Sequence, residues 1–357
     1  MTAVHQFVTG ATPGNAIYNE ALIMQQALRR LSLTSEIFAE RIHPSLQKTV
    51  AHYEQYRPQP DDMLLFHYSL GSALSDYVLE LPQKLILRYH NVTPPHFLVG
   101  ANPWLRAGAA KGRADLPLFA SRTMLALADS AFNEQDLLAA NFAQTAVLPL
   151  IQPDELFHTE PDPALLNQLR DGRPNLLFVG RISPNKRQED LLKTLYFYRQ
   201  INPTARLLLV GSEDGAGGYG RFLRNFAQAV GLETAVQFSG HVSLAQLAAY
   251  YRAASVYVCL SEHEGFCQPL VESMRFGLPI VAFASTAVPG TMGGSGILIQ
   301  QKNYPVLAEL IHLLVTDTTL RQTIITGQTE RAAAFATDGL LEQFKQLVTA
   351  GLFSSRL

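Results

Sequence analysis

Two basic residues at the start of the second half of the chain have the types and spacing to bind a diphosphate. In FVGRISPNK, an apolar run predicts a strand, Gly180 lets the backbone turn tightly, and Arg181 and Lys186 follow in one short loop. A guanidinium offers a planar fork of donors and an ammonium a compact charge. Together they could neutralise a departing nucleoside diphosphate. A basic surface loop is the alternative, which the position after a strand disfavours.

A second string, SEHEGFCQPLVESMRF, places two carboxylates around the start of one predicted helix. Its loop follows a predicted strand, and the loop residues able to touch a ligand are Glu264, Gly265, Phe266 and Cys267. Pro269 suits the first turn of the helix, because its missing N–H costs nothing there. Gly277 is placed to end the helix, and Glu272 is expected in its first turn.

These carboxylates would lie at the carboxyl edge of a parallel sheet, which is where such sheets bind ligands. The free N–H groups of the helix suit a diphosphate. Glu264 and Glu272 then suit hydroxyls on the sugar side and the ribose side. The alternative is that both residues only favour the helix dipole, and the complete string of glycines, proline and aromatic argues against it.

The elements that must position these residues alternate between strands and helices in both halves, which predicts parallel α/β sheets. In the first half we expect strands at Val4–Thr9, Met63–Tyr68, Lys84–Tyr89 and Val147–Leu150, and helices at Ala16–Leu31 and around Ser121–Ala128. In the second half we expect strands at Asn175–Val179, Arg206–Val210, Val236–Ser239, Val256–Leu260 and Pro279–Ala282, with helices between them. The predicted fold is two Rossmann-like, doubly wound domains that face a cleft.

A length of 357 residues also favours two domains. We expect an N-terminal domain over 1–152, a proline-rich linker over 153–174 and a second domain over 175–335, which carries the candidate diphosphate-binding residues. Residues 336–357 are expected to form a C-terminal helix that could pack back on the first domain.

The composition indicates which functional classes and which cellular location to expect. The formal net charge of −2 gives no reason to expect nucleic-acid binding. Two cysteines, no signal-peptide pattern and no apolar run of about 20 residues favour a cytoplasmic protein. Peripheral membrane contact stays open, because a basic segment could meet a lipid-linked or phosphorylated acceptor, although a solvated basic face is favoured. Its cations are Arg106, Lys111, Arg113 and Arg122.

The second half resembles the retaining glycosyltransferases of family 4, which have the GT-B fold. The matching strings, in the family's order over about residues 175–300, are FVGRISPNKRQEDLL, RLLLVGSEDG, VQFSGHV and EHEGFCQPLVESMRFGLPIVA. The resemblance implies that Arg181 and Lys186 grip the donor diphosphate. It also implies that Glu264 contacts the donor sugar, that Glu272 contacts the ribose, and that the loop near Val242 lines the base.

The N-terminal half matches more loosely. In ILRYHNVTPP, the resemblance implies a site role for His90 near the donor sugar, while His67 in LLFHYSLGS is a weaker candidate. Gly10 and Gly14 match a glycine loop that lies near the phosphates or the acceptor. The second half also departs from the family pattern: Gly290 stands where relatives commonly place Glu, and Cys267-Gln268 where Gly-Leu is common.

The activity implied is transfer of a hexose from a nucleoside-diphosphate sugar, GDP-mannose or a UDP-sugar, to an acceptor hydroxyl with retention of configuration. The acceptor would be a saccharide, glycolipid or other hydroxyl compound in polysaccharide or glycoconjugate synthesis. The resemblance implies that the domain over 1–152 binds this acceptor and that the domain over 175–335 binds the nucleotide sugar. No cofactor beyond the donor and no metal is expected, since there is no DxD string and no His/Cys ligand spacing. A GT-B sugar-nucleotide epimerase or an inactive donor-binding scaffold subunit remains open. A nicotinamide-dependent oxidoreductase is disfavoured because G-x-G-x-x-G is absent.

Overall fold

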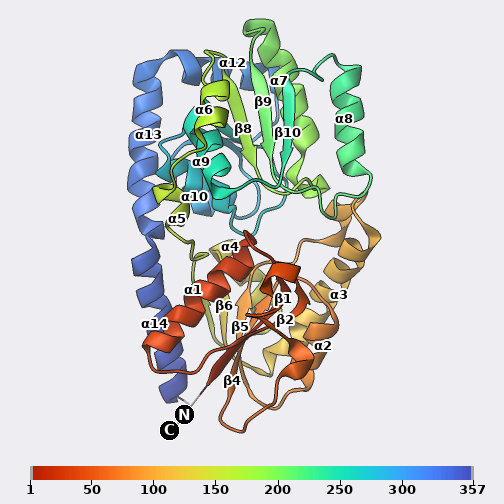
Figure 1. Cartoon of the computed structure of the whole chain (residues 1–357), viewed down its shortest axis with the longest axis vertical. Coiled ribbons are helices and arrows are strands. Elements are labelled where there is room, and N and C mark those ends of the chain that lie inside the picture. Colours follow the sequence, from red (N-terminus) through yellow and green to blue (C-terminus); the bar gives the residue numbers. More distant parts are fainter. Residues whose placement is uncertain (1–2, 355–357) are drawn as a thin grey trace. The chain divides into compact units, whose positions relative to one another are not determined.

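The computed structural model describes residues 3–354, with side chains described for residues 3–350. The chain divides into two compact units (Figure 1). The first comprises Met1–Pro95, Ala107–Pro153 and Phe335–Leu357, and the second comprises His96–Arg106 and Asp154–Ala334. Residues 96–106, which the sequence prediction gave to the first domain, therefore belong to the second unit.

The first unit contains a seven-stranded, parallel sheet in the order β3-β2-β1-β4-β5-β6-β7. Its strands are β1 (Val4–Ala11), β2 (Ile37–Ile42), β3 (Ala51–His52), β4 (Met63–Tyr68), β5 (Lys84–Tyr89), β6 (Thr123–Ala128) and β7 (Thr145–Val147). The strand order reverses between β1 and β4. The central strands are buried apolar runs, as expected for a parallel sheet with helices on both faces.

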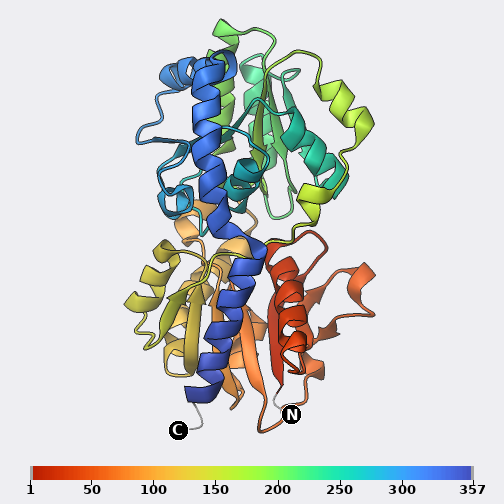
Figure 2. The same ribbon diagram turned by 90° about the vertical axis from the view of Figure 1, so that its left-hand side faces the viewer.

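The helices of this unit are α1 (Ala16–Arg30), α2 (Ala73–Glu80), α3 (Pro103–Ala120), α4 (Ala131–Ala139) and α14 (Thr337–Ser354). On one face, Leu340 and Phe344 of α14 pack in one core cluster with Met24 and Leu28 of α1. Figure 2 shows α14 in blue beside α1 in red. The last helix of the described chain therefore completes the core of the first unit.

The second unit contains a six-stranded, parallel sheet in the order β10-β9-β8-β11-β12-β13. Its strands are β8 (Asn175–Val179), β9 (Arg206–Val210), β10 (Val236–Gly240), β11 (Val256–Cys259), β12 (Ile280–Phe283) and β13 (Ile297–Ile299). The order reverses between β8 and β11, which pair through Val256 with Leu176. Such a switch point leaves a crevice at the carboxyl ends of the two strands.

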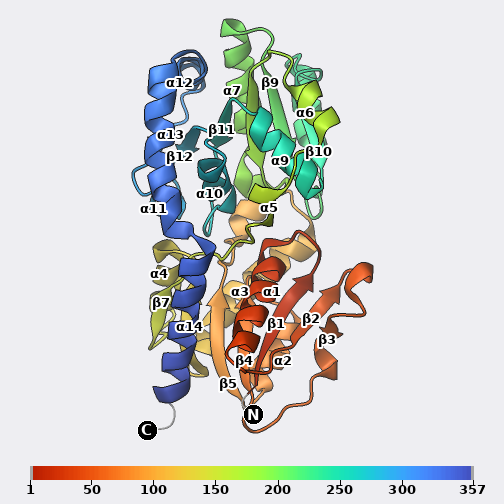
Figure 3. The same ribbon diagram turned by 60° about the vertical axis from the view of Figure 1, so that its left-hand side comes forward.

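Helices cover both faces of this second sheet (Figures 1 and 3). Its helices are α5 (Glu155–His158), α6 (Pro163–Leu169), α7 (Gln188–Ile201), α8 (Tyr219–Ala229), α9 (Leu244–Ala253), α10 (Gln268–Arg275), α11 (Val288–Met292), α12 (Tyr304–Thr316) and α13 (Thr318–Ala332). Residues of α7, α8 and α12 share one core cluster, and residues of α6, α9 and α10 share the other. Each face is thereby closed by its own apolar layer.

The predicted α/β class with two parallel sheets is confirmed, and β4, β5, β8 and β9 have the predicted bounds. The helix predicted around Ser121–Ala128 is wrong, because Thr123–Ala128 is strand β6. Alanine and leucine favour helices in isolation, but pairing between β5 and β7 overrides that preference. Among the helices in residues 3–354, none is both long and apolar enough to cross a bilayer.

Candidate functional site

At the switch point of the second sheet, an ammonium and a carboxylate from distant parts of the chain form an ion pair. Lys186 ends a short turn, Pro184–Lys186, after β8, and its Nζ lies 2.5 Å from Oε2 of Glu264 in the loop after β11. Their side chains are 22% and 6% exposed. Burial alone would lower the pKa of Lys186, but the Glu264 carboxylate outweighs it, so the pKa is raised. Lys186 is therefore held as a cation at the edge where ligands bind.

Asn185 joins the two loops that carry this pair. Its Nδ2 donates to the carbonyl of His263 at 3.0 Å, and its own carbonyl accepts from the N–H of Glu262 at 2.9 Å. The Ser183 hydroxyl donates to Oδ1 of Asn185 at 2.6 Å. Sequence reasoning missed Asn185, because its partner His263 lies 78 residues away in the chain. A short polar residue next to proline is also typical of an ordinary turn.

The backbone of the Glu264 loop is held from the other side by Thr286. The N–H of Glu264 donates to Thr286 Oγ1 at 2.8 Å, and the same hydroxyl donates to the Glu264 carbonyl at 2.9 Å. Gly265 is half-buried, whereas Phe266 and Cys267 are buried at the start of α10. Their side chains therefore support the loop, and a ligand contact from this stretch would come from Gly265 or the backbone.

The cysteine pair adds packing at the same place. The Sγ atoms of Cys259 and Cys267 lie 3.9 Å apart, and both thiols are free and buried. Cys267 is the N-cap residue that precedes α10, and its backbone is left-handed, at φ 67°. Its position, where the family pattern has glycine, is thus consistent with a backbone conformation that glycine adopts without strain.

Glu272 lies in α10, just beyond the first turn in which it was expected. The helix begins at Gln268 and has no acidic residue in its first turn, so the first-turn placement is wrong. Both carboxylate oxygens already accept hydrogen bonds, one from the Tyr251 hydroxyl at 2.5 Å and one from Gln268 Nε2 at 2.7 Å. Burial raises the pKa of Glu272, and these two hydrogen bonds oppose the rise. A carboxylate this well held is positioned rigidly beside the sheet edge.

Glu272→Gln should therefore leave the fold intact or strengthen it at neutral pH. The amide keeps partners for Tyr251 and Gln268 without the cost of burying a charge. Because the folded-state pKa is raised, the wild-type protein gains stability on acidification as the carboxylate takes up a proton. The advantage of the variant should shrink as the pH falls from neutral toward the ordinary Glu value of 4.5. Thermal unfolding across that pH range measures this.

Glu309→Gln, which removes an exposed carboxylate of α12, is the matched control for loss of a charge. Its stability relative to the wild type should not change with pH in the way expected for Glu272→Gln. A Glu272→Gln protein that is less stable than wild type by the same amount at every pH would contradict the account of a buried, charged Glu272.

Arg181 and Gly180 lie where β8 meets its loop. Arg181 is exposed, and its carbonyl accepts from Gln188 Nε2 at 3.1 Å. Gly180 has φ +151° and passes close to Gly211 at the end of β9. A Cβ added at Gly211 would stand 2.2 Å from the Gly180 carbonyl oxygen. Gly211 was not singled out from the sequence, although its place after RLLLV is a signal for such a close approach.

Two further predicted positions of this unit lie in the loop after β10 and in α11. Val242 is half-buried in the loop after β10 and packs at the edge of the apolar layer beneath α9 and α10. Gly290 lies in α11, and a Cβ there would meet nothing within 4 Å. The position would accept the glutamate of the family pattern without a clash.

In the first unit, the histidines lie in a buried polar network. His67 Nδ1 is 3.0 Å from His90 Nε2, and His67 Nε2 is 2.9 Å from Gln6 Oε1. His90 Nδ1 is 3.1 Å from Asp129 Oδ2. Burial, together with His90 and Arg88, lowers the pKa of His67 well below its ordinary value. Both ring nitrogens of His90 are engaged inside this unit, and a role beside the donor sugar stays a prediction.

Arg88 supplies the charge balance of that network. It is fully buried, with its guanidinium 2.7 Å from Glu20 and 2.8 Å from Asp129. Gly10 lies within β1, and Gly14 has φ 78° in the turn before α1. The glycine turn therefore follows β1, and His67 of the histidine network lies in the neighbouring strand β4.

The basic segment after residue 105 is paired through much of its length. Lys111 lies 2.6 Å from both Asp76 and Asp115, and Arg113 lies 3.1 Å from Asp136. Arg122 donates to the Leu79 carbonyl at 3.1 Å. These contacts support the structural interpretation of the segment over contact with a charged acceptor.

Two groups of potential metal ligands come together although they are scattered in the sequence. They are Glu20, His67 and His90 in the first unit and Cys259, Glu264 and Cys267 in the second. In each group the carboxylate already pairs with a cation, Arg88 or Lys186. A buried cation on the carboxylate disfavours a metal ion there, and we do not propose one.

Comparison with known proteins identifies the class of the second unit. The family described as "Glycosyl transferases group 1" matches residues 167–331. The chain is 30% identical to a D-inositol 3-phosphate glycosyltransferase of Thermobifida fusca over 181 residues, which cover 48% of this chain and 42% of that protein. It is 32% identical to the protein of the same name from Stackebrandtia nassauensis over 217 residues, 56% and 47% of the two chains. The resemblance predicted from the motifs is confirmed: residues 167–331 are similar to group 1 glycosyltransferases.

The fold extends over the whole chain. A crystal structure of Anabaena Alr3699/HepE in complex with UDP and glucose matches with a TM-score of 0.78 at 18% identity, covering 98% of this chain and 100% of that one. The predicted GT-B fold class is thereby confirmed. In sequence, the chain spans about half the length of the curated relatives it matches.

Proposed function

We propose that this protein transfers a hexose from a nucleoside-diphosphate sugar to an acceptor hydroxyl with retention of configuration. The observation that carries the proposal is the ion pair of Lys186 and Glu264 at the switch point of a sheet in a domain similar to group 1 glycosyltransferases. The UDP and glucose bound to the Anabaena structure support a UDP-hexose as the first donor to test, with GDP-mannose second.

In the proposed reaction, the bond between the anomeric carbon and the diphosphate oxygen breaks while the acceptor oxygen bonds to the same face. Arg181 and Lys186 stabilise the charge that develops on the departing diphosphate. The acceptor proton passes to an oxygen of that leaving group, so no separate strong base is needed. Glu264 and Glu272 accept hydrogen bonds from hydroxyls of the donor sugar and ribose.

The proposal assigns the two cations the work that a divalent metal does in other transferases. Donor turnover should accordingly persist in the presence of a chelator. The first unit, with its glycine turn and histidine network, is proposed to receive the acceptor, which would be a saccharide, glycolipid or other hydroxyl compound.

Thermal unfolding with UDP-, GDP- and ADP-sugars tests donor binding. A ligand at about 100 times its dissociation constant stabilises the folded state by about 2.7 kcal/mol, so one nucleotide series should raise the melting temperature. Arg181→Ala should reduce that rise, whereas Arg221→Ala, an exposed arginine of α8, should not.

Proton NMR of the donor incubated alone then separates the enzyme classes, because epimeric sugar nucleotides have equal masses but different spectra. Slow hydrolysis fits a transferase, while conversion to an epimeric sugar nucleotide would show an epimerase. If no sugar nucleotide stabilises the protein, or if Arg181→Ala leaves the full stabilisation in place, the proposed donor site is wrong.

A further inference from the structure

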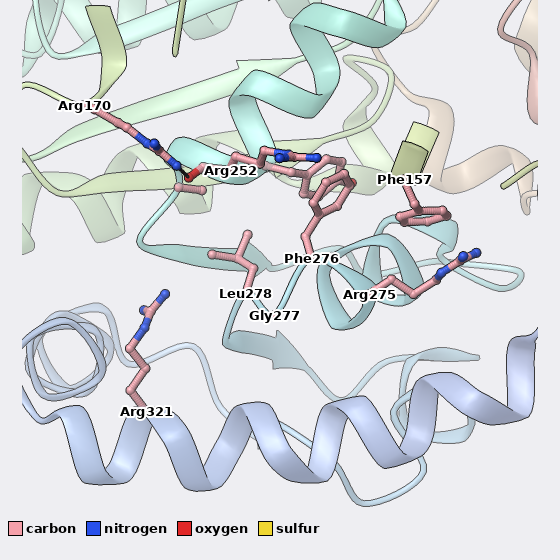
Figure 4. A pocket seen from close by; sticks show the side chains of 10 residues that line it. Phe157, Arg170, Arg252, Arg275, Phe276, Gly277, Leu278 and Arg321 are labelled. Carbon is pink, nitrogen blue, oxygen red and sulfur yellow. Dashed lines mark hydrogen bonds between the residues drawn. The ribbon is translucent and has the colours of Figure 1, made fainter. Parts of the chain in front are cut away.

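A second, open cavity lies at the opposite edge of the second sheet. Lys186 follows the carboxyl end of β8, whereas this cavity is bounded by the turns before the amino ends of β11 and β12. Its volume is about 420 Å³. Figure 4 shows its lining side chains, which include Phe157, Arg170, Arg252, Arg275, Phe276, Leu278 and Arg321. The four arginines come from α6, α9, α10 and α13 or the residues that end them, and we call this site the arginine cavity.

Three of these guanidiniums lack a carboxylate partner among the described side chains. Arg170 donates to the carbonyl of Arg252 at 3.4 Å, and Arg321 donates to the carbonyl of Ser255 at 2.5 Å. Arg252 has no ion pair within residues 3–350 and is exposed. The fourth, Arg275, is engaged elsewhere, as the next contacts show. The cavity therefore concentrates positive charge that the protein itself does not neutralise.

Arg275 also lines the cavity, but its charge is neutralised by a carboxylate. Its Nη1 lies 2.6 Å from Asp154 Oδ1, and its guanidinium stacks 3.5 Å from the centre of the Phe157 ring. In Figure 4 it points away from the other three, toward that ring. It shapes one end of the cavity and leaves the anion-binding capacity to the remaining three.

Helix dipoles explain only part of this cluster. Arg252 and Arg275 lie in the last turns of α9 and α10, where a cation is favoured. Arg321 is the fourth residue of α13, at the helix end where a cation is disfavoured. It nevertheless reaches toward the cavity (Figure 4), and burial lowers its pKa. A bound anion would offset that cost.

We propose that the arginine cavity binds a small molecule that carries two or more phosphate groups. Guanidiniums bind phosphate through paired, charge-assisted hydrogen bonds, and Arg170, Arg252 and Arg321 can divide two phosphates between them. The volume fits a small ligand, and the half-buried ring of Phe276 offers apolar surface to the rest of it.

The cavity is also connected to the donor site through one residue. Tyr251 lines the cavity, stacks on Phe276 with ring centres 4.9 Å apart, and donates its hydroxyl to Glu272. A ligand in the cavity would thus contact the side chains that hold Glu272.

Calorimetric titration of the full chain with inorganic pyrophosphate tests the proposal. The background is Arg181→Ala/Lys186→Met, so that the donor loop cannot supply the signal and the proposed function is not at issue. This background protein should bind pyrophosphate more tightly than inorganic phosphate. Adding Arg252→Glu or Arg321→Gln should weaken pyrophosphate binding by at least about tenfold, equal to about 1.4 kcal/mol. Adding Arg221→Glu, an exposed charge reversal on α8, should not.

Absence of pyrophosphate binding to the background protein would overturn the proposal, as would equal weakening by Arg221→Glu. Vesicles of phosphatidylcholine and phosphatidylglycerol distinguish a lipid headgroup from a free phosphate compound. Vesicle binding that depends on Arg252 without pyrophosphate binding would assign the cluster to a membrane surface and overturn the small-molecule proposal. Circular dichroism checks that each variant is folded. If Arg321→Gln does not fold, pyrophosphate binding by Arg252→Glu, a change at an exposed residue, decides between the outcomes.

Discussion

Replacing Lys186 with methionine should lower the rate of donor cleavage by about 10²- to 10³-fold, the usual cost of removing one group that stabilises developing negative charge. The ammonium is fixed 2.5 Å from Glu264 at the switch point, and its raised pKa keeps it charged. The rate is measured as hydrolysis of the preferred donor without acceptor, with the released nucleoside diphosphate as the readout. The binding constant should change less than the rate, because the charge to be stabilised develops during bond cleavage.

The variant will also be less stable, since Glu264 is left buried without its partner at a cost of about 1–3 kcal/mol. The double variant Lys186→Met/Glu264→Gln separates the two effects. It removes both charges together, so much of the stability should return while the cleavage rate stays low. Recovery of both stability and rate in the double variant would show that Lys186 only neutralises Glu264.

Gly211→Ala should unfold or severely weaken the second unit, by an amount on the order of 2–4 kcal/mol. The residue has φ +149°, and its new Cβ would lie 2.2 Å from the Gly180 carbonyl oxygen and 2.6 Å from its carbonyl carbon. Neither atom can retreat, because Gly180 donates its N–H to Val210 across the sheet at 2.9 Å. The clash can be relieved only if the backbone of the loop that carries Arg181 moves. Chemical denaturation measures the loss of stability. The stabilisation by a sugar nucleotide measures whether the loop that carries Arg181 still binds the donor.

Gly218→Ala is the control for this substitution. It has an ordinary φ of −78°, and a Cβ there meets nothing within 4 Å. Its unfolding midpoint should stay close to that of the wild type. Equal losses in the two variants would mean that the approach of Gly211 to Gly180 is not the cause.

The sequence predicts the second unit well because its strands are short, apolar and separated by clear turn residues. Asn175–Val179 and Arg206–Val210 have the predicted bounds, and the motif spacing correctly places Lys186 and Glu264 in loops after strands. The predicted first-turn position of Glu272 is wrong by one residue, because the helix begins at Gln268. Residues that favour turns show where a loop lies. The exact first residue of a helix depends on backbone geometry, which the composition does not encode.

Contacts between distant segments could not be predicted in this way. Asn185 is identifiable only once β8 and β11 are neighbours. Likewise, the arginine cavity draws on separate helices, and no spacing in the chain relates Arg170 to Arg321. In the first unit, the alanine- and leucine-rich composition of β6 predicts a helix, but its pairing with neighbouring strands makes it a strand.

The adjacency of β8 and β11 has a consequence for how the protein acquires its binding capacity. The two strands pair directly, yet β9, β10 and three helices lie between them in the chain. Closing so long a segment is entropically costly and slow. A nascent or proteolysed chain that stops before Val256 would hold Arg181 and Lys186 but neither carboxylate. Recognition of the sugar nucleotide should thus appear late in refolding, as a single cooperative step.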